Sequence, residues 1–334
     1  MPPSVWNILD FEKPIAELDE QIAEIKRLTQ EQGQDRSEDI AALERDRDRL
    51  IQEIFSNLTA WDRVLLARHP KRPYTLDYAR LIFDDYVELH GDRLFSDDKA
   101  MVGGIAVLDG QPVVFIGQQK GRDLKDRQYR NFGSAKPEGY RKALRLMRLA
   151  EKFRRPVICL VDTPAADCSV EAEERGISES IARNLMEMSR LETPIIAAIL
   201  GEGGSGGAIG IAVADRVLML ENSIYSVIPP EGCAAILWGD PTRHKEMAEA
   251  LKITSAEALK LGVIDEVIPE PLGGAHRNVE QTAKNLKAAI IRHLNELNKL
   301  PIDELTDKRY AKFRAMGEFE DLSLAEAQDA AASG

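Results

Sequence analysis

Apolar strands alternate with amphipathic helices in the central part of the chain, from residue 101 to residue 220. The strands are apolar without a break, which is the pattern of strands that are buried on both faces. The intervening helices carry apolar residues at spacings of three and four, as at Ala143, Met147 and Ala150. Strand–helix–strand units of this kind form a parallel sheet covered by helices, so the sequence predicts an α/β fold. We expect strands over 157–161, 195–200 and 217–220, and helices over 137–153 and 172–191.

Two hairpins are expected before this alternation begins. Residues 101–117 are two apolar runs joined by Asp109-Gly110, a dipeptide that favours the two-residue turn of a β-hairpin. Nearer the N-terminus, apolar residues recur at helical spacing from Ile15 to Leu28 and from Ile40 to Ile54, with Gly33 between the two sets. Two antiparallel helices joined near Gly33 would bury both stripes against each other. We expect this N-terminal helical hairpin to be an interaction element.

Prolines mark where the N-terminal helices end. Pro70 and Pro73 each disfavour helical backbone at the preceding residue. A helix is expected over 280–300, and the tail from Gly317 is expected to be frayed. The predicted domains are a helical hairpin over 1–67, a main α/β domain over 68–300, and a C-terminal helix with its tail over 301–334.

Composition excludes several classes of protein. The chain has 334 residues, a net charge of −12 and three cysteines without C-x-x-C spacing, so neither a disulfide framework nor a thiolate zinc site is predicted. Residues 1–14 lack the basic start and apolar core of a signal peptide, and no apolar run approaches the ~18 residues of a membrane span. We expect a cytoplasmic protein.

Positive charge is concentrated in residues 120–155. This segment holds 13 Lys and Arg against four acidic residues, a net charge of +9 in a chain whose remainder is −21. Such a patch on an acidic protein indicates a phosphate-bearing ligand or an acidic partner, and not a surface that coats nucleic acid. From charge alone, a solvated helix face explains it equally well.

Six of the ten residues from Gly201 to Gly210 are glycine, directly after a predicted strand. This run predicts a strand, a tight turn and a helix N-terminus, with a short helix to Ala214. Unpaired backbone N–H groups there can face a negative charge. In parallel sheets, ligands lie outside the carboxyl ends of the strands. The three loops that qualify are 118–122, 162–171 and 201–207.

The glycine run fits three functional motifs and one structural one. Gly201, Gly203 and Gly206 match the G-x-G-x-x-G of dinucleotide sites, but too few residues follow for a full crossover helix. Gly203, Ser205 and Gly207 match the G-x-S-x-G of serine hydrolases, although no histidine stands in a recognisable signature. The third interpretation is a backbone oxyanion hole, in which glycines let the chain pass close to an enolate-like ligand. Tight strand–helix packing is the structural alternative.

Longer blocks of sequence resemble a known family. They are the glycine run at 201–207, Tyr225-Ser-Val and the block Pro230–Trp238, and the segments at 138–147, 68–77 and 269–278. Together they resemble the alpha subunits of the bacterial and plastid acetyl-coenzyme A carboxylase carboxyltransferases, from about Asn7 to Gly317. The resemblance implies a crotonase-like fold, a superhelix of ββα units, and an active site shared with a beta subunit in an α2β2 heterotetramer.

The resemblance also implies a reaction and its partners. A carboxyl group passes from carboxybiotin, supplied in trans by the biotin carboxyl carrier protein, to acetyl-coenzyme A, giving malonyl-coenzyme A for fatty-acid synthesis. Zinc would belong to the beta subunit, ATP would be used only by the biotin carboxylase partner, and this chain would hold no metal. Membrane and nucleic-acid partners are not expected. The location would be the cytoplasm, or the plastid stroma in a photosynthetic eukaryote.

The family's oxyanion hole maps onto the backbone of Gly206 and Gly207. Its N–H groups would stabilise the charge that develops on the biotin ureido oxygen, by ~3–4 kcal/mol for each well-placed donor. The departing biotin anion can take the methyl proton itself, which makes a catalytic triad superfluous. The residues expected to bind substrate or carboxybiotin are Gly203, Gly204, Ser205, Ala165, Ala166, Lys120, Gly121 and Arg122.

One loop departs from the family pattern. After Asp162-Thr-Pro164, family members usually continue with Gly-Ala-aromatic-Pro-Gly, whereas this chain has Ala165, Ala166, Asp167, Cys168 and Ser169. If the family glycines have positive φ, alanine and serine there would cost on the order of 1 kcal/mol each. Gln118, where histidine is common, and Pro229, where serine is common, are smaller departures. The alternative to a working subunit is therefore a carboxyltransferase-like paralogue that is inactive or uses a different acyl-coenzyme A.

Overall fold

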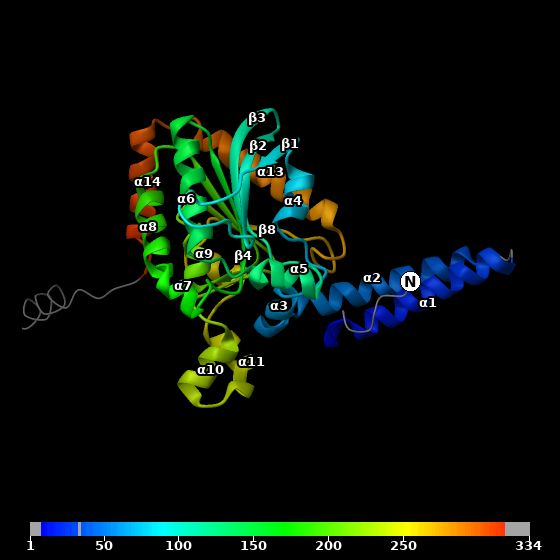
Figure 1. The fold of residues 1–334 in the computed structure, drawn as a ribbon. Coiled ribbons are helices and arrows are strands. Elements are labelled where there is room, and N and C mark those ends of the chain that lie inside the picture. Colours follow the sequence, from blue (N-terminus) through cyan, green and yellow to red (C-terminus); the bar gives the residue numbers. More distant parts are fainter. Residues whose placement is uncertain (1–7, 33–34, 318–334) are drawn as a thin grey trace, which may run out of the picture.

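The computed structural model describes residues 8–32 and 35–317, and its centre is a mixed sheet with helices on both faces (Figure 1). The strands run in the order β1-β2-β3-β4-β5-β6-β8, and β7 pairs with the end of β5. The first three strands are antiparallel and the remaining pairings are parallel. Their bounds are β1 Asp85–Glu88, β2 Met101–Leu108, β3 Gln111–Gln118, β4 Val157–Thr163, β5 Ile195–Gly204, β6 Arg216–Leu220, β7 Ile224–Ser226 and β8 Glu266–Ile268.

The predicted hairpin is confirmed as β2 and β3. Leu108 pairs with Gln111, so Asp109 and Gly110 are the two turn residues. Both have positive φ, 51° and 75°, which matches the twist that a two-residue hairpin turn requires. In this hairpin, β3 lies beside β4 in the sheet. The carboxyl end of β3 forms one border of the candidate site.

Each central strand contributes side chains to both faces of the sheet. In β4, Cys159 and Val161 pack on one face, and Ile158 and Leu160 pack on the other. The first face is covered by α6 (Pro137–Lys152) and α8 (Ile177–Arg190), and the second by α4 (Thr75–Ile82) and α13 (Val279–Leu297) (Figure 1). The parallel sheet covered by helices is therefore confirmed, because both strand faces are buried in apolar layers.

Two predicted elements are wrong in their bounds. The helix expected over 172–191 is two helices, α7 (Val170–Glu174) and α8, because Gly176 between them has a φ of 78°. The helix expected to reach Ala214 is α9 (Ser205–Ile209), only five residues long. Apolar residues keep their helical spacing past the break at Gly176 and past the end of α9. Periodicity alone therefore could not locate these two boundaries.

The N-terminal helices α1 (Lys13–Gln32) and α2 (Ser37–Ser56) pack side by side and extend away from the sheet (Figure 1). The ion pairs Lys26–Glu44 and Arg47–Asp19 join them. The helical hairpin is confirmed, although Gly33 itself lies outside the described residues. A third helix, α3 (Ala60–Ala67), packs instead against β5, β7 and α11 (His244–Ala250). The predicted domain boundary at residue 67 stays a prediction.

The other helices of the described residues are α5 (Leu124–Tyr129), α10 (Pro230–Trp238), α12 (Ser255–Lys260) and α14 (Ile302–Arg314), with short 3-10 helices at Asp10–Glu12, Asn131–Gly133 and Pro241–Arg243. Helices α10 and α11 stand away from the sheet on the side where α9 begins (Figure 1). The predicted frayed tail, beyond Gly317, lies outside the described residues. Within the part of the chain that the structure describes, no helix is both long and apolar enough to span a membrane.

Candidate functional site at the strand ends

The glycine run continues strand β5 and then starts helix α9. Gly201 to Gly204 are the last four residues of β5, and Ser205 is the first residue of α9, so the expected tight turn between strand and helix is absent. Gly203 and Gly204 pair with Tyr225 and Ser226 of β7. Glycine is required at 201, 203 and 204, because an added Cβ atom would stand 2.7, 2.8 and 2.0 Å, respectively, from a neighbouring atom.

Close approach of neighbouring atoms explains three of these glycines. A Cβ atom on Gly204 would stand 2.0 Å from the Pro164 carbonyl oxygen, and one on Gly207 would stand 2.6 Å from the carbonyl carbon of Ala165. One on Gly201 would stand 2.7 Å from Asp162 Oδ1. The run thus packs directly against the loop that follows β4, and the sites predicted at 162–171 and 201–207 are brought together.

Ser205 occupies the sharpest point of the strand-to-helix junction. Its φ is 50°, a left-handed conformation that costs a serine about 1 kcal/mol or more. A nucleophilic serine has the same local geometry, but the cavity of about 380 Å³ beside Ser205 is lined by Gly206, Ile209, Tyr225, Ser226, Val227 and Val263. That lining offers neither a histidine nor a carboxylate to activate a hydroxyl, which disfavours the hydrolase interpretation.

Lys120 links all three strand ends. Its Nζ lies 2.7 Å from Asp162 Oδ1 at the end of β4 and 2.7 Å from Glu202 Oε2 in β5. Glu202 in turn accepts a hydrogen bond from Arg68 Nε at 2.7 Å, and Arg68 pairs with Glu231 of α10 at 2.6 Å. A chain of alternating charges therefore runs from β3 through β5 to α10.

Burial and pairing have opposite effects on these groups. Burial lowers the pKa of Lys120, but Asp162 and Glu202 outweigh it and raise the pKa above its usual value, so the ammonium stays charged. Burial raises the pKa of Glu202, but Lys120 and Arg68 hold it below the usual value. Removing Lys120 would leave two buried carboxylates facing each other, which makes it a structural as well as a candidate binding residue.

A cavity of about 270 Å³ opens between α3, α4 and the loop after β3. It is lined by Lys120, Arg122, Pro164 and Glu202, together with Ala67, Arg68, Pro70, Tyr74, Arg127 and Phe132. The Arg122 guanidinium stacks 4.1 Å from the centroid of the Tyr74 ring. Four cationic side chains and one carboxylate line this space, which suits an anionic ligand.

The predicted site residues that line hollows divide among three of them. Lys120 and Arg122 line the cationic cavity, whereas Ser205 and Gly206 line the apolar one beside Tyr225. Gly203 and Gly204 lie between them, in a hollow of about 10 Å³ bordered by Arg68 and Pro229. Sequence analysis missed Tyr74, Arg127 and Phe132. Their positions on three separate elements gave no common spacing, and only the 68–77 block and the basic segment pointed to their neighbourhood.

Six of the 13 Lys and Arg residues in the basic segment form ion pairs with carboxylates of the chain. Its ion pairs join Lys120 to Asp162 and Glu202, Arg122 to Asp77, Arg130 to Asp126, Arg141 to Asp92 and Glu138, Lys142 to Asp97 and Arg148 to Glu187. The patch is therefore smaller than its net charge of +9 indicated. What faces a possible ligand is the cavity lining, where Arg127 lies 5.5 Å from the Phe132 ring.

The unusual loop at 165–169 is not strained. No residue from 165 to 169 has a positive φ, so the expected cost of alanine and serine there does not arise. Asp167 Oδ2 accepts a hydrogen bond from Asn131 Nδ2 at 3.1 Å, and Ser169 caps α7 through the N–H of Ala172. The substituted residues thus form a loop of their own, held by bonds that proline, glycine and an aromatic ring could not make.

Glu12, His69 and His276 lie close enough together to hold a metal ion, with ligand atoms within 4.8 Å of one another. The imidazole rings stack at 4.0 Å, and Lys71 N–H donates to His69 Nδ1 at 3.1 Å. In a neutral imidazole this places the proton on Nε2, the atom facing Glu12, where it blocks a metal bond. The cluster fits a hydrogen-bonded contact better, and the expectation of no metal in this chain stays a prediction.

Curated relatives cover almost the whole chain. A protein of Geobacter metallireducens is 57% identical over 93% of this chain and 98% of its own length, and one of Fusobacterium nucleatum is 54% identical over 93% and 99%. One of Staphylococcus carnosus is 54% identical over 94% and 100%. Each is named acetyl-coenzyme A carboxylase carboxyl transferase subunit alpha.

Solved structures share the fold at low identity. The Pseudomonas malonate decarboxylase hetero-dimer matches with a TM-score of 0.53 at 18% identity, covering 69% of this chain and 91% of that one. The beta subunit of geranyl-CoA carboxylase from P. aeruginosa matches with a TM-score of 0.52 at 14% identity, covering 79% and 48%. Transcarboxylase 12S matches with a TM-score of 0.51 at 21% identity, covering 66% and 42%. The predicted crotonase-like fold is confirmed by these neighbours.

The family match covers the part of the chain that forms the sheet and the candidate site. The family described as "Acetyl co-enzyme A carboxylase carboxyltransferase-like" matches residues 8–317, which include the sheet, the glycine run and the N-terminal helices. Neither the relatives nor the relaxed loop at 165–169 supports an inactive paralogue. The chain belongs to the acetyl-coenzyme A carboxylase carboxyltransferase family.

Proposed function

We propose that this chain is the alpha subunit of an acetyl-coenzyme A carboxylase carboxyltransferase. It would work in an α2β2 complex with a beta subunit, receive carboxybiotin on the biotin carboxyl carrier protein, and form malonyl-coenzyme A from acetyl-coenzyme A. Zinc in the beta subunit, ATP use by the biotin carboxylase and a cytoplasmic location are parts of the same proposal. The observation that carries it is the full-length identity of 57% to a relative with this name.

The transfer requires one carbon–nitrogen bond to break and one carbon–carbon bond to form. The carboxyl group leaves a ureido nitrogen of biotin and bonds to the methyl carbon of acetyl-coenzyme A, and the methyl proton passes to the ureido group. Negative charge develops on the ureido oxygen during this exchange. Backbone N–H groups at the start of α9, at Gly206 and Gly207, would stabilise that charge, because the first N–H groups of a helix have no partner within it.

The cationic cavity suits the anionic part of a substrate. Arg122 and Arg127 present guanidinium groups stacked on Tyr74 and Phe132, and stacked guanidinium groups bind planar or phosphate-bearing anions well. Lys120 is already engaged by two carboxylates, so its contribution would be to hold Glu202 and Asp162 in place. We assign this cavity to substrate binding and the Gly206–Gly207 backbone to catalysis.

The test is malonyl-coenzyme A formation by the assembled complex. This chain is produced with the beta subunit of its own organism, the complex is purified, and acetyl-coenzyme A and carboxybiotin are supplied. We expect turnover that depends on both subunits. Absence of turnover from a complex of the correct mass would overturn the proposal.

A loop variant tests the inactive alternative separately. The substitutions Ala165→Gly, Asp167→Tyr, Cys168→Pro and Ser169→Gly restore the family pattern. Because the present loop is unstrained and bonded through Asp167 and Ser169, we expect no gain in rate and a small loss of stability. A large gain in rate would show instead that the loop limits the wild-type protein.

A further inference from the structure

We propose that Gln118 is a positioning residue of the carboxyl-transfer site, which acts by holding the Gly207 carbonyl and thereby fixing the first turn of α9. Gln118 is the last residue of β3 and is wholly buried. Its Nε2 donates to the Gly207 carbonyl oxygen at 2.8 Å. The inference rests on the proposed function, because it concerns the backbone groups assigned to catalysis there.

The orientation of the Gln118 amide is determined by its partners. Its Oε1 accepts a hydrogen bond from the backbone N–H of Asp162 at 3.0 Å, at the end of β4. A backbone N–H can only donate and a carbonyl can only accept, so a flipped amide would lose both bonds. One side chain from β3 therefore joins β4 to α9, and sets their relative position at the site.

The Gly207 carbonyl depends on side chains for its hydrogen bonds. The backbone N–H groups that could reach it, those of Gly210 and Ile211, donate to Gly206 and Ala208 instead. The second donor to this carbonyl is the Tyr140 hydroxyl, at the longer distance of 3.2 Å. Helix α9 has five residues and cannot hold its own geometry, so these two donors anchor its first turn.

Small displacements of this turn matter for the chemistry. Gly207 packs on Ala165 and Ala166 with no spare room, so the peptide can move only away from that loop. A displacement of about 1 Å between a catalytic group and the reacting atoms costs about 100-fold in rate. Loss of the Gln118 bond is therefore expected to lower kcat, while the cationic cavity keeps its lining and its affinity.

Two substitutions of matched size separate positioning from folding. Gln118→Met removes the donor and the acceptor, and Gln118→Glu keeps the acceptor for Asp162 but donates to Gly207 only when protonated. Lys120, Asp162, Glu202 and Tyr140 are titratable groups around position 118, on the strand ends and on α6. These groups titrate in the wild type as well. The pH dependence of the ratio of variant to wild-type rate therefore reports the titration of the new carboxyl at position 118 alone.

We expect Gln118→Met to lower kcat about 10-fold or more, with KM for acetyl-coenzyme A within two-fold of wild type. For Gln118→Glu, the kcat ratio to wild type should rise as the pH falls from about 9 to about 6, because a buried glutamate takes up its proton in that range. The control is Thr193→Val, which removes a buried side-chain bond to the Arg155 carbonyl at the opposite end of the sheet. It should lower Tm without changing kcat.

The outcomes distinguish this inference from the proposed function. An active wild-type complex whose kcat is unchanged in both Gln118 variants at every pH would overturn the role of Gln118 alone. An inactive wild-type complex would overturn the proposed function and this inference with it. Should Gln118→Met fail to assemble, the pH series of Gln118→Glu decides, since a merely structural role would not restore kcat on protonation.

Discussion

At Gly207, an added Cβ atom would stand 2.6 Å from the carbonyl carbon of Ala165 and 2.7 Å from the backbone nitrogen of Ala166. At Gly206, its nearest neighbour would be Ile181 Cδ1 at 3.4 Å, an ordinary contact. Neither glycine has a positive φ, so packing alone separates the two. The requirement for glycine therefore differs between two adjacent residues of one motif.

We predict that Gly207→Ala lowers the free energy of unfolding by about 1–3 kcal/mol, because the backbone of residues 165–166 must shift to admit the methyl group. Gly206→Ala is the matched control, and it should be neutral or slightly stabilising, since alanine favours a helix by up to ~1 kcal/mol over glycine. Urea unfolding of the two variants measures the difference. Equal destabilisation would contradict the contact with the 165–166 loop.

The sequence predicts single residues of the site only where they lie together in the chain. Gly203 to Gly207 stand out because they are contiguous, and their position after an apolar strand indicates backbone chemistry. Gln118 reaches Gly207 across 89 residues, and no local pattern marks a glutamine that ends a strand as a partner of a distant carbonyl. That contact depends on how β3, β4 and β5 lie in register, which only the folded sheet determines.

Among the elements, the N-terminal hairpin contacts the sheet domain through Asp19, which pairs with Arg277 at 3.2 Å, and through Glu12. Glu12, just before α1, accepts a hydrogen bond from His276 Nε2 at 3.0 Å and lies 3.8 Å from His69 Nε2. Glu12 is also nearly buried. Burial raises the pKa of Glu12, but the hydrogen bond and charges of the two histidines outweigh it and hold the pKa below its usual value of 4.5.

This contact gives the docking of α1 a dependence on pH. A carboxyl with a lowered pKa in the folded state stabilises that state above its unfolded pKa, near 4.5, and loses the effect as the pH falls through the lower folded value. We predict that Glu12→Gln weakens docking at pH 7 by about 1–3 kcal/mol and removes the loss below pH 4.5. Amide hydrogen exchange of α1 measures both effects. Unchanged exchange at pH 7 would show that the apolar contacts of Ile15 and Ile22 suffice.

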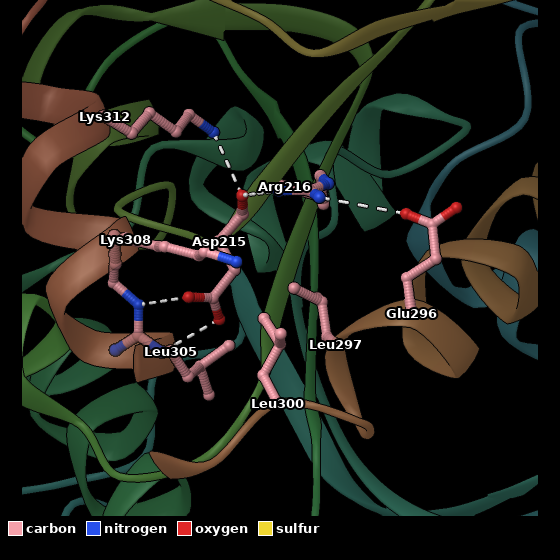
Figure 2. Close-up of a pocket in the computed structure, with 9 residues that line it drawn as sticks. Asp215, Arg216, Glu296, Leu297, Leu300, Leu305, Lys308 and Lys312 are labelled. Carbon is pink, nitrogen blue, oxygen red and sulfur yellow. Dashed lines mark hydrogen bonds and ion pairs between the residues drawn. The ribbon is translucent and has the colours of Figure 1, made fainter. Parts of the chain in front are cut away.

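A buried arginine of helix α14 makes five hydrogen bonds to the sheet domain. Arg309 binds both carboxylate oxygens of Asp215 at 2.8 Å and donates to the carbonyls of Met188, Leu191 and Thr193. Figure 2 shows Asp215 between α14 and β6, with Lys312 and Arg216 beside it around a cavity of about 160 Å³. The cations lining this cavity have carboxylate partners in the chain, so the arrangement is structural.

We predict that Arg309→Met lowers the free energy of unfolding by about 3–5 kcal/mol, because it leaves the Asp215 carboxylate buried without its counter-charge. Adding Asp215→Asn should recover part of the loss, since the double variant buries no unpaired charge. Chemical denaturation of the two single variants and the double variant gives the coupling energy. Additive losses would contradict a direct pair.

Element types follow from the sequence more reliably than element ends. The hairpin turn at Asp109-Gly110 and the strand β4 were predictable, because turn chemistry and unbroken apolar runs are local signals. The break at Gly176 was not, since the apolar face continues from α7 into α8 and only a φ of 78° interrupts it. The end of β5 was also misplaced. Three of its last four residues are glycines, and an added Cβ atom on Gly204 would stand 2.0 Å from the Pro164 carbonyl oxygen.

On the scale of the whole molecule, α10 and α11 form a projection, and the C-terminal end of α10 exposes apolar side chains. Ile236 and Leu237 are 74% and 67% exposed, and Val227 at the base of the projection is 74% exposed. Contiguous exposed apolar side chains are typical of surfaces that another chain covers. The alternation of strands and helices in the sequence predicted the sheet. The projection lies outside that alternation, and no comparable pattern in the sequence predicted it.

We predict that Ile236→Glu with Leu237→Glu weakens association with the beta subunit by about 10-fold or more, while the isolated chain keeps its Tm. A charge at an exposed position is solvated in the isolated chain and leaves its stability unchanged, but it would be buried at an interface and would weaken association. Leu81→Glu, at an exposed position on α4, is the matched control and should leave association unchanged. Analytical ultracentrifugation of the mixed subunits measures both. Normal assembly of the double variant would place the beta subunit elsewhere.

Strand β5 pairs with different strands along its length. Its first half pairs with β6, and its last three residues, Glu202 to Gly204, pair with β7, which leads directly into α10. The same three residues therefore connect to the projection, through β7, and to the start of α9, which follows them in the chain. A compound that separates β7 from β5 would act on oligomer formation and turnover together, and resistance to it would arise at these strand residues, which include Glu202 of the cationic cavity.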